Sequence, residues 1–283
     1  MNRRLFKERT ILFTLYGFTV CGCLVLAVIL ATVFIKGSPA ISGAFLFEES
    51  RNFGLEGGIF YQIVGTLILM TGAALVCLPV ALGSVLFQTE FLHSPQLKKL
   101  FRLLIYSLNA VPTIIFGLIG YLFFGVFLEA GVSWVTGVLI LAVMILPTLH
   151  VSIHEAVESI PKHYREAGLA LGLSPGQQMR AVILPQSLHG IVTGTLLGLA
   201  RAAGETAAIM FTATAFSGVR LPQSWTEPVT TLQTHFLVLA QEAANPLALT
   251  NAWGAGLVLL MIVFVLIAVT LWIRSGLQME AQR

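Results

Sequence analysis

Six long apolar stretches alternate with shorter polar segments along the chain. Crossing a bilayer core of about 30 Å takes roughly 20 apolar residues of helix, and each stretch is close to or above that length. None of them alternates apolar and polar positions as a membrane β-strand does. The pattern therefore predicts an all-α, polytopic helical membrane protein with six transmembrane helices, at residues 11–35, 63–87, 103–128, 132–150, 188–216 and 252–273.

Composition supports this fold class. The chain of 283 residues is 57% hydrophobic and 10% charged, and its mean hydropathy is +0.89. These values exclude an ordinary soluble domain, so we expect a lipid bilayer rather than nucleic acid as the surroundings. We expect one transmembrane domain over residues 1–283. Its core at 58–273 follows an arm, first span and outer loop at 1–57, and precedes a tail at 274–283.

Positive charge is concentrated on one side of the predicted membrane. Most of the 16 Lys and Arg residues lie in the N-terminal arm, the loop after the second span, the polar segment before the fifth span and the tail. The other side has Lys36, Arg51 and Arg220. The positive-inside rule places both termini in the cytoplasm. The first apolar run is longer than that of a signal peptide, so we expect it to remain as a span.

Familiar catalytic motifs are absent from the sequence. It has no GxxxxGK[ST] loop for ATP, no GxSxG and no HExxH. His150, His154 and Glu158 are spaced to share one helical face, but nothing else in the sequence completes a metal site. We interpret them as polar residues where a helix leaves the membrane. We therefore expect no catalytic residue, metal or cofactor in this chain, and any energy must come from a partner.

A polar segment at residues 155–189 precedes the fifth span. Good helix formers at residues 164–171 are followed by Gly172 and by Ser174-Pro175-Gly176, which break a helix. A second short helix is predicted from about Gln177. The resulting hairpin would leave leucines in water unless a partner covered them. These leucines are Leu169, Leu171 and Leu173.

The same segment resembles the EAA loop of bacterial ABC importer permeases. The family pattern is EAA, three residues, Gly, nine residues, Ile, one residue, Leu-Pro; here Gly168 replaces Ala and Val182 replaces Ile. The resemblance implies the type I permease architecture, with a cytoplasmic coupling helix that docks on an ATPase subunit. An amphipathic hairpin lying on the membrane surface is the alternative. The coupling residues it implies are Glu166, Ala167, Gly168, Gly172, Leu173, Leu184 and Pro185.

Four further stretches are similar to the PstA-type permeases of phosphate-specific ABC importers, and the sister PstC type shares much of the pattern. The resemblance implies an ATP-driven phosphate import subunit in a bacterial inner membrane. Its implied partners are a second homologous permease, an ABC ATPase dimer that binds ATP and Mg²⁺, and a periplasmic phosphate-binding protein. Ala208 stands where the family has Pro, which leaves molybdate, sulfate and phosphonate open as alternative substrates. The stretches are residues 109–117, 145–148, 199–207 and 252–255.

Two charged residues lie inside the fifth span. Arg201 is about 20 Å along the helix from Leu188, where a charge costs at least about 2.5–3.5 kcal/mol. Glu205 follows one turn later, close enough to pair with it. The pair is interpreted either as a lock between helices or as part of the substrate path. We favour the path, in which Arg201 attracts the anion and Glu205 keeps it from binding too tightly.

Small residues recur every four positions before and beside this pair, and they are predicted to form a helix-packing seam. Arg201 borders the row on the helical wheel, so we expect the seam to lie between two permease subunits. A rival interpretation is a secondary transporter that works alone through the Arg201–Glu205 pair, although it leaves the polar hairpin unexplained. A membrane enzyme lacks a recognisable nucleophile. The row consists of Gly190, Gly194, Gly198 and Ala202.

Overall fold

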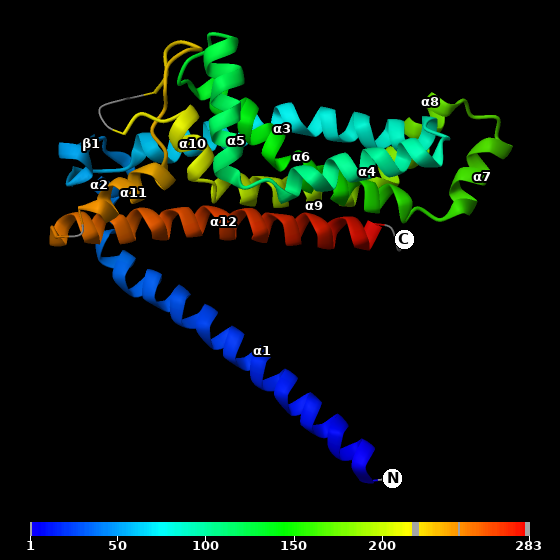
Figure 1. Ribbon diagram of the computed structural model, residues 1–283, viewed down its shortest axis with the longest axis horizontal. Helices are drawn as coiled ribbons and strands as arrows, with labels where there is room; N and C mark the ends of the chain where they lie inside the picture. The colour runs from blue at the N-terminus through cyan, green and yellow to red at the C-terminus, as the bar shows by residue number, and fades with distance from the viewer. Residues whose placement is uncertain (1, 217–220, 243, 281–283) are drawn as a thin grey trace.

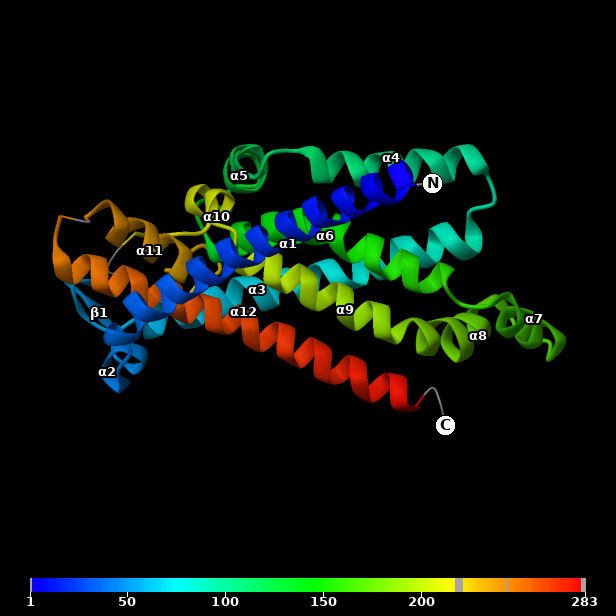
Figure 2. The same cartoon turned by 90° about the horizontal axis from the view of Figure 1, so that it is seen from below.

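The computed structural model describes residues 2–216, 221–242 and 244–280. Its body is a bundle of long helices that run beside one another (Figures 1 and 2). Apolar side chains from α3, α6 and α9 fill the centre, among them Leu69, Ile145 and Ile191. These helices are apolar on most sides, so their outward faces suit lipid while their inward faces form the core. The bundle helices are α3 (Phe60–Leu86), α6 (Trp134–Glu158), α9 (Leu184–Ala203) and α12 (Pro246–Glu280).

The first helix, α1 (Asn2–Gly37), leaves the bundle at an angle (Figure 1). It contacts α12 near its C-terminal end, where Gly37 packs so closely on the Trp253 carbonyl that a Cβ would overlap it. Lys36 Nζ lies 5.2 Å from the centre of the Trp253 ring, a cation–π contact. The apolar side chains from Ile11 to Ile35 remain exposed in this chain. They are available to lipid or to another subunit.

The predicted span at residues 103–128 is wrong as a single helix. The structure has α4 (Pro95–Ala110), then α5 (Thr113–Gly120) with its π-helical continuation η4 (Tyr121–Phe127), and the two parts are bent by 98°. Pro112 causes the break because it lacks an N–H and excludes the helical conformation of the residue before it. Val111 is accordingly extended, with φ −74° and ψ 128°.

The predicted span at residues 188–216 is also interrupted. Helix α9 ends at Ala203, and a short helix, α10 (Ala207–Thr212), follows after three residues. The side-chain amide of Gln233 donates a 2.5 Å hydrogen bond to the Ala203 carbonyl. This bond satisfies a carbonyl that the end of a helix leaves without a partner. The remaining four spans are confirmed as helices; the one predicted at 132–150 runs over Trp134–Glu158.

Short elements close the two ends of the bundle. At one end, the antiparallel pair β1–β2 aligns Ser50 with Gly57, and the short helix α11 lies at the same end. The opposite end carries the hairpin of α7 and α8; we call the two the α11 end and the α7 end. The start of α1 and the end of α12 both lie toward the α7 end (Figures 1 and 2). The bounds are η1 (Ser38–Ala40), α2 (Gly43–Phe47), β1 (Ser50–Arg51), η2 (Asn52–Gly54), β2 (Glu56–Gly57), η3 (Phe87–Phe91), α7 (Lys162–Ala170), α8 (Pro175–Gln178), η5 (Met179–Ile183) and α11 (Leu232–Gln241).

Candidate functional site

Arg201 is the centre of a polar network in the middle of the bundle. It lies in the last turn of α9, and its Nη1 donates to Asn109 Oδ1 at 2.9 Å and to Thr148 Oγ1 at 3.1 Å. Asn109 is in the last turn of α4, next to the break, and Thr148 is in α6. Both partners are neutral, so they orient the guanidinium without cancelling its charge. Its other N–H groups have no protein acceptor in the described part of the chain and are free to meet an anion.

Glu205 does not pair with Arg201, which corrects the sequence interpretation. Its side chain is 9% exposed, and its Oε1 accepts a 3.1 Å hydrogen bond from the Ala208 backbone N–H. The carboxylate therefore caps the first turn of α10, where a negative charge is favourable. The expected pairing required one continuous helix from Arg201 to Glu205. Because α9 ends at Ala203, the two side chains do not share a helical face.

The row of small residues on α9 packs against α6 of the same chain. A Cβ added at Gly190 would overlap Ala156, one at Gly194 would approach Ser152, and one at Gly198 would overlap Leu149. Ala202, which completes the row, is buried as well. The row is a seam for close helix packing. The seam was expected to lie between two subunits. That prediction is wrong, because the row packs against α6 of the same chain.

The α7–α8 hairpin is built by an interrupted helix with a glycine C-cap. Gly172 has φ +71°; its N–H donates to the Leu169 carbonyl at 2.9 Å, and the Leu173 N–H donates to the Gly168 carbonyl at 3.1 Å. This pair of bonds is a Schellman motif, which favours glycine at the left-handed position. The Ser174 and Gln177 side chains then form a capping box at the start of α8.

The residues of the EAA-like pattern lie around this turn. Glu166 and Ala167 are exposed on α7, whereas Gly168 is buried against Leu173. The side chains of Leu169 and Leu171 are 63% and 80% exposed. The second helix expected from about Gln177 is present as α8, but it is not short. Helix α8 continues through η5 into α9 without a gap, so Leu184 and Pro185 belong to the first turn of α9.

Sequence analysis missed the role of Arg165 at the root of the hairpin. Its Nη1 lies 2.5 Å from Glu90 Oε1 in the π-helical turn that ends the α3 segment, and its Nη2 donates to the Val157 carbonyl of α6 at 3.1 Å. The Gln178 side chain donates to the Arg165 carbonyl at 3.0 Å. Arg165 thus ties the hairpin to two bundle helices. The available signal was Glu90, an acidic residue directly after an apolar span.

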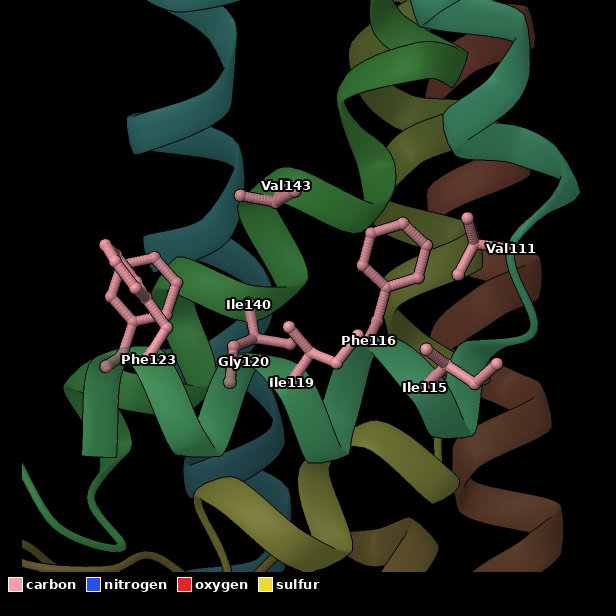
Figure 3. Close-up of a pocket in the computed structure, with 9 residues that line it drawn as sticks. Val111, Ile115, Phe116, Ile119, Gly120, Phe123, Ile140 and Val143 are labelled. Atoms are coloured by element: carbon pink, nitrogen blue, oxygen red, sulfur yellow. The ribbon is translucent and has the colours of Figure 1, made fainter. Parts of the chain in front are cut away.

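The bundle has one cavity beside α5 and another at the α7 end. One of about 300 Å³ lies between α5 and α6, and Figure 3 shows its labelled side chains, such as Phe116, Ile119 and Ile140, pointing into it. Its lining is entirely apolar, so it does not suit an anion. Another, of about 210 Å³, lies at the α7 end beside His150 and His154. His154 Nε2 is 3.3 Å from Glu158 Oε1, and no metal-binding group of three ligands forms among the described residues.

Comparisons with known proteins give a consistent picture. The family model described as "Binding-protein-dependent transport system inner membrane component" matches residues 80–278. The probable phosphate transport system permease protein PstA of Methanocaldococcus jannaschii is 34% identical over 263 residues, which are 92% of this chain and 90% of that protein. Phosphate transport system permease protein PstA 2 of Mycobacterium bovis is 34% identical over 199 residues. That match covers 68% of this chain and 65% of the relative, so it spans just under two thirds of the relative's length.

The fold also resembles solved membrane proteins. A chain of the bacterial alginate ABC transporter, solved in complex with alginate pentasaccharide-bound periplasmic protein, superposes with a TM-score of 0.68. The alignment covers 93% of each chain at 14% identity. At that identity the likeness shows the fold alone.

Proposed function

The chain belongs to the family of binding-protein-dependent transport system inner membrane components, and from that premise we propose that it is the permease subunit of an ATP-driven phosphate importer. The fold is confirmed as the helical, multi-pass fold of type I ABC permeases. Membership of a transport family also agrees with the expectation that the chain is not an enzyme. The observation that carries the proposal is Arg201, a guanidinium in mid-bundle that has neutral partners only.

The chemistry of Arg201 suits transport of an oxyanion. Its planar guanidinium can donate two parallel hydrogen bonds to phosphate oxygens, while Asn109 and Thr148 hold one edge of the group in place. A single positive charge attracts the anion without trapping it, and a transport path must release what it binds. Glu205 lies close by in the chain at the α9–α10 break, and we propose that its negative charge weakens retention of the anion.

The rest of the proposed assembly follows from the two ends of the bundle. The exposed leucines of the α7–α8 hairpin need a cover in water, and a groove on an ATPase subunit that carries ATP and Mg²⁺ would supply it. We propose that a second homologous permease completes the path beside the exposed faces of α1, α4 and α5. A periplasmic phosphate-binding protein would dock at the α11 end, and the basic α7 end would face the cytoplasm of a bacterial inner membrane.

Uptake of radiolabelled phosphate by proteoliposomes that hold the full complex tests this function. Wild type should accumulate phosphate with ATP, and Arg201→Gln should lose most uptake while still assembling. Arg201→Lys keeps the charge but not the planar fork, so we expect partial uptake. Arg51→Gln removes an exposed arginine at the α11 end and serves as the matched control. Uptake of sulfate, molybdate or a phosphonate in place of phosphate would contradict the proposal, as would full phosphate uptake by Arg201→Gln.

A further inference from the structure

Two adjoining cavities at the α7 end form one polar vestibule. Their volumes are about 210 and 270 Å³, and both are lined by Gln88, Arg102, His154 and Glu158. The walls come from η3, α4, α6 and the start of α7. Basic groups predominate in the larger cavity. We call the region the basic vestibule and define it by Gln88, Lys98, Arg102, His154, Lys162 and Arg165.

Buried polar atoms without partners line the floor of this vestibule. His150 is 3% exposed and its Nε2 has no hydrogen-bond partner. His154 Nδ1 and Gln88 Oε1 are also buried atoms without a hydrogen-bond partner. Leaving a buried polar atom unpaired is unfavourable, and such atoms in a native fold usually mark a place where water or a ligand belongs. Two of these three side chains are imidazoles, which can donate a hydrogen bond to an anion.

The charges that face the vestibule favour a negative ligand. Among the described residues, Lys98 and Arg102 have no carboxylate partner, whereas the guanidinium of Arg165 is taken by Glu90 and Val157. The acidic groups nearby are Glu155, Glu158 and Glu90: Glu158 lies against His154, and Glu155 lines the smaller cavity at its exposed edge. The larger cavity therefore has a surplus of positive charge, from Lys98, Arg102 and Lys162 against Glu158, since Glu90 balances Arg165.

Helix α4 links the vestibule to the Arg201 network. Arg102 precedes Asn109 by seven residues on α4, which is about two helical turns and the same face of the helix. The vestibule therefore lies on the α7 side of the Arg201 network along this face of α4.

We propose that the basic vestibule binds a phosphate group on the α7 side of the membrane. The group is either inorganic phosphate that has passed Arg201, a source that rests on the proposed function, or the headgroup of an anionic phospholipid. Arg102 and Lys98 supply the charge, and the buried histidines supply donors at the floor. Because Lys162 and Arg165 belong to the root of the hairpin, the bound group lies beside the proposed coupling element.

Thermal unfolding of the purified complex in phosphatidylcholine nanodiscs, without ATP, tests the site. One arm titrates sodium phosphate at constant ionic strength against chloride, and the other adds phosphatidylglycerol to the nanodisc. We expect one of these additions to raise the unfolding midpoint of wild type. Lys99→Gln is the matched control, since Lys99 neighbours Lys98 on α4 but lies outside the vestibule. It should keep the full shift.

Arg102→Gln and Lys98→Gln should need about tenfold more ligand for the same shift, because each loses a charged contact. Arg102→Lys should recover part of it, which separates loss of binding from loss of folding. In an Arg201→Gln background, Arg102→Gln should still raise the ligand needed for the remaining shift, which separates this site from the path. A shift with phosphatidylglycerol alone identifies a lipid headgroup. No shift in either arm, or equal shifts in Arg102→Gln and Lys99→Gln, overturns the proposal. Phosphate uptake is measured separately, so failure of the importer proposal remains distinguishable.

Discussion

Arg201 and Glu205 show how the surroundings of a side chain change its role. The sequence places them four residues apart, and the structure gives each a different partner. Asn109 and Thr148 hold the guanidinium through neutral oxygens, and the Ala208 N–H engages the carboxylate. The arginine therefore keeps an uncompensated charge, which a conventional ion pair would have removed. This retained charge is what the proposed anion transport rests on.

At the level of single residues, we predict that Gly190→Ala destabilises the protein. An added methyl group would overlap Ala156, whose Cβ has no rotamer by which to move away, and overpacking of this kind costs about 1–3 kcal/mol. Gly83→Ala is the matched control, because nothing lies within 4 Å of the new Cβ, and alanine is the better helix former by about 1 kcal/mol. Thermal unfolding in detergent should show a lower midpoint for Gly190→Ala only. Equal midpoints for the two variants would contradict the tight α6–α9 seam.

A pH dependence follows from His235 on α11. Burial lowers its pKa from 6.5 to about 4, because a charged imidazole is poorly solvated there. Between pH 6.5 and 4 the unfolded chain therefore binds a proton that the folded chain does not, so stability falls as the pH falls. The loss is about 3 kcal/mol over this range. Between pH 7 and 4 the unfolding midpoint of wild type should fall relative to that of His235→Leu, which has no imidazole to protonate; parallel profiles would refute this assignment.

Among the helices, two interruptions create the candidate path. The α4–α5 bend at Pro112 and the α9 end at Ala203 leave Asn109 and Arg201 at neighbouring helix ends. Broken helices at membrane depth expose backbone groups, which must find partners. Gln233 supplies one for Ala203. The two breaks therefore place a polar site inside a bundle that is otherwise apolar.

The Arg165–Glu90 contact should govern how hairpin motion reaches the bundle. We predict that Arg165→Gln lowers phosphate uptake per ATP hydrolysed several-fold in proteoliposomes, because the hairpin loses hydrogen bonds to a charged group that are worth about 1.5–3 kcal/mol each. The exchange Arg165→Glu with Glu90→Arg should restore part of the coupling. Arg180→Gln, which removes an exposed arginine nearby, is the control. If the Arg165→Gln complex behaves like this control, the Arg165–Glu90 contact does not couple the hairpin to the bundle.

For the whole molecule, the two ends of the bundle predict the orientation in the membrane. Basic residues gather at the α7 end, and the start of α1 and the end of α12 lie toward the same end. In a chain whose three cysteines are replaced by alanine, Ser159→Cys should react with a membrane-impermeant maleimide only in inside-out vesicles. Ala244→Cys, near the start of α12, should react only in intact cells with a permeabilised outer membrane. Labelling of both positions from the same side would disprove this orientation.

The sequence by itself determined the class of the protein, because length and apolarity decide whether a helix can cross a bilayer. It also located the α7–α8 hairpin, since Gly172 and Ser174-Pro175-Gly176 interrupt helices through local geometry alone. It did not predict the bend of 98° at Pro112, because the chain beyond a break takes the direction that packing allows.

Only the tertiary structure decided which groups meet. Asn109, Thr148 and Arg201 come from three helices, and Arg165 finds Glu90 across 75 residues of sequence. It also assigned the glycine row to α6 rather than to another subunit, since a row of small residues specifies close approach but not the partner. Hydrophobic patterning acts along one helix, whereas polar partners are selected by the packing of the whole bundle.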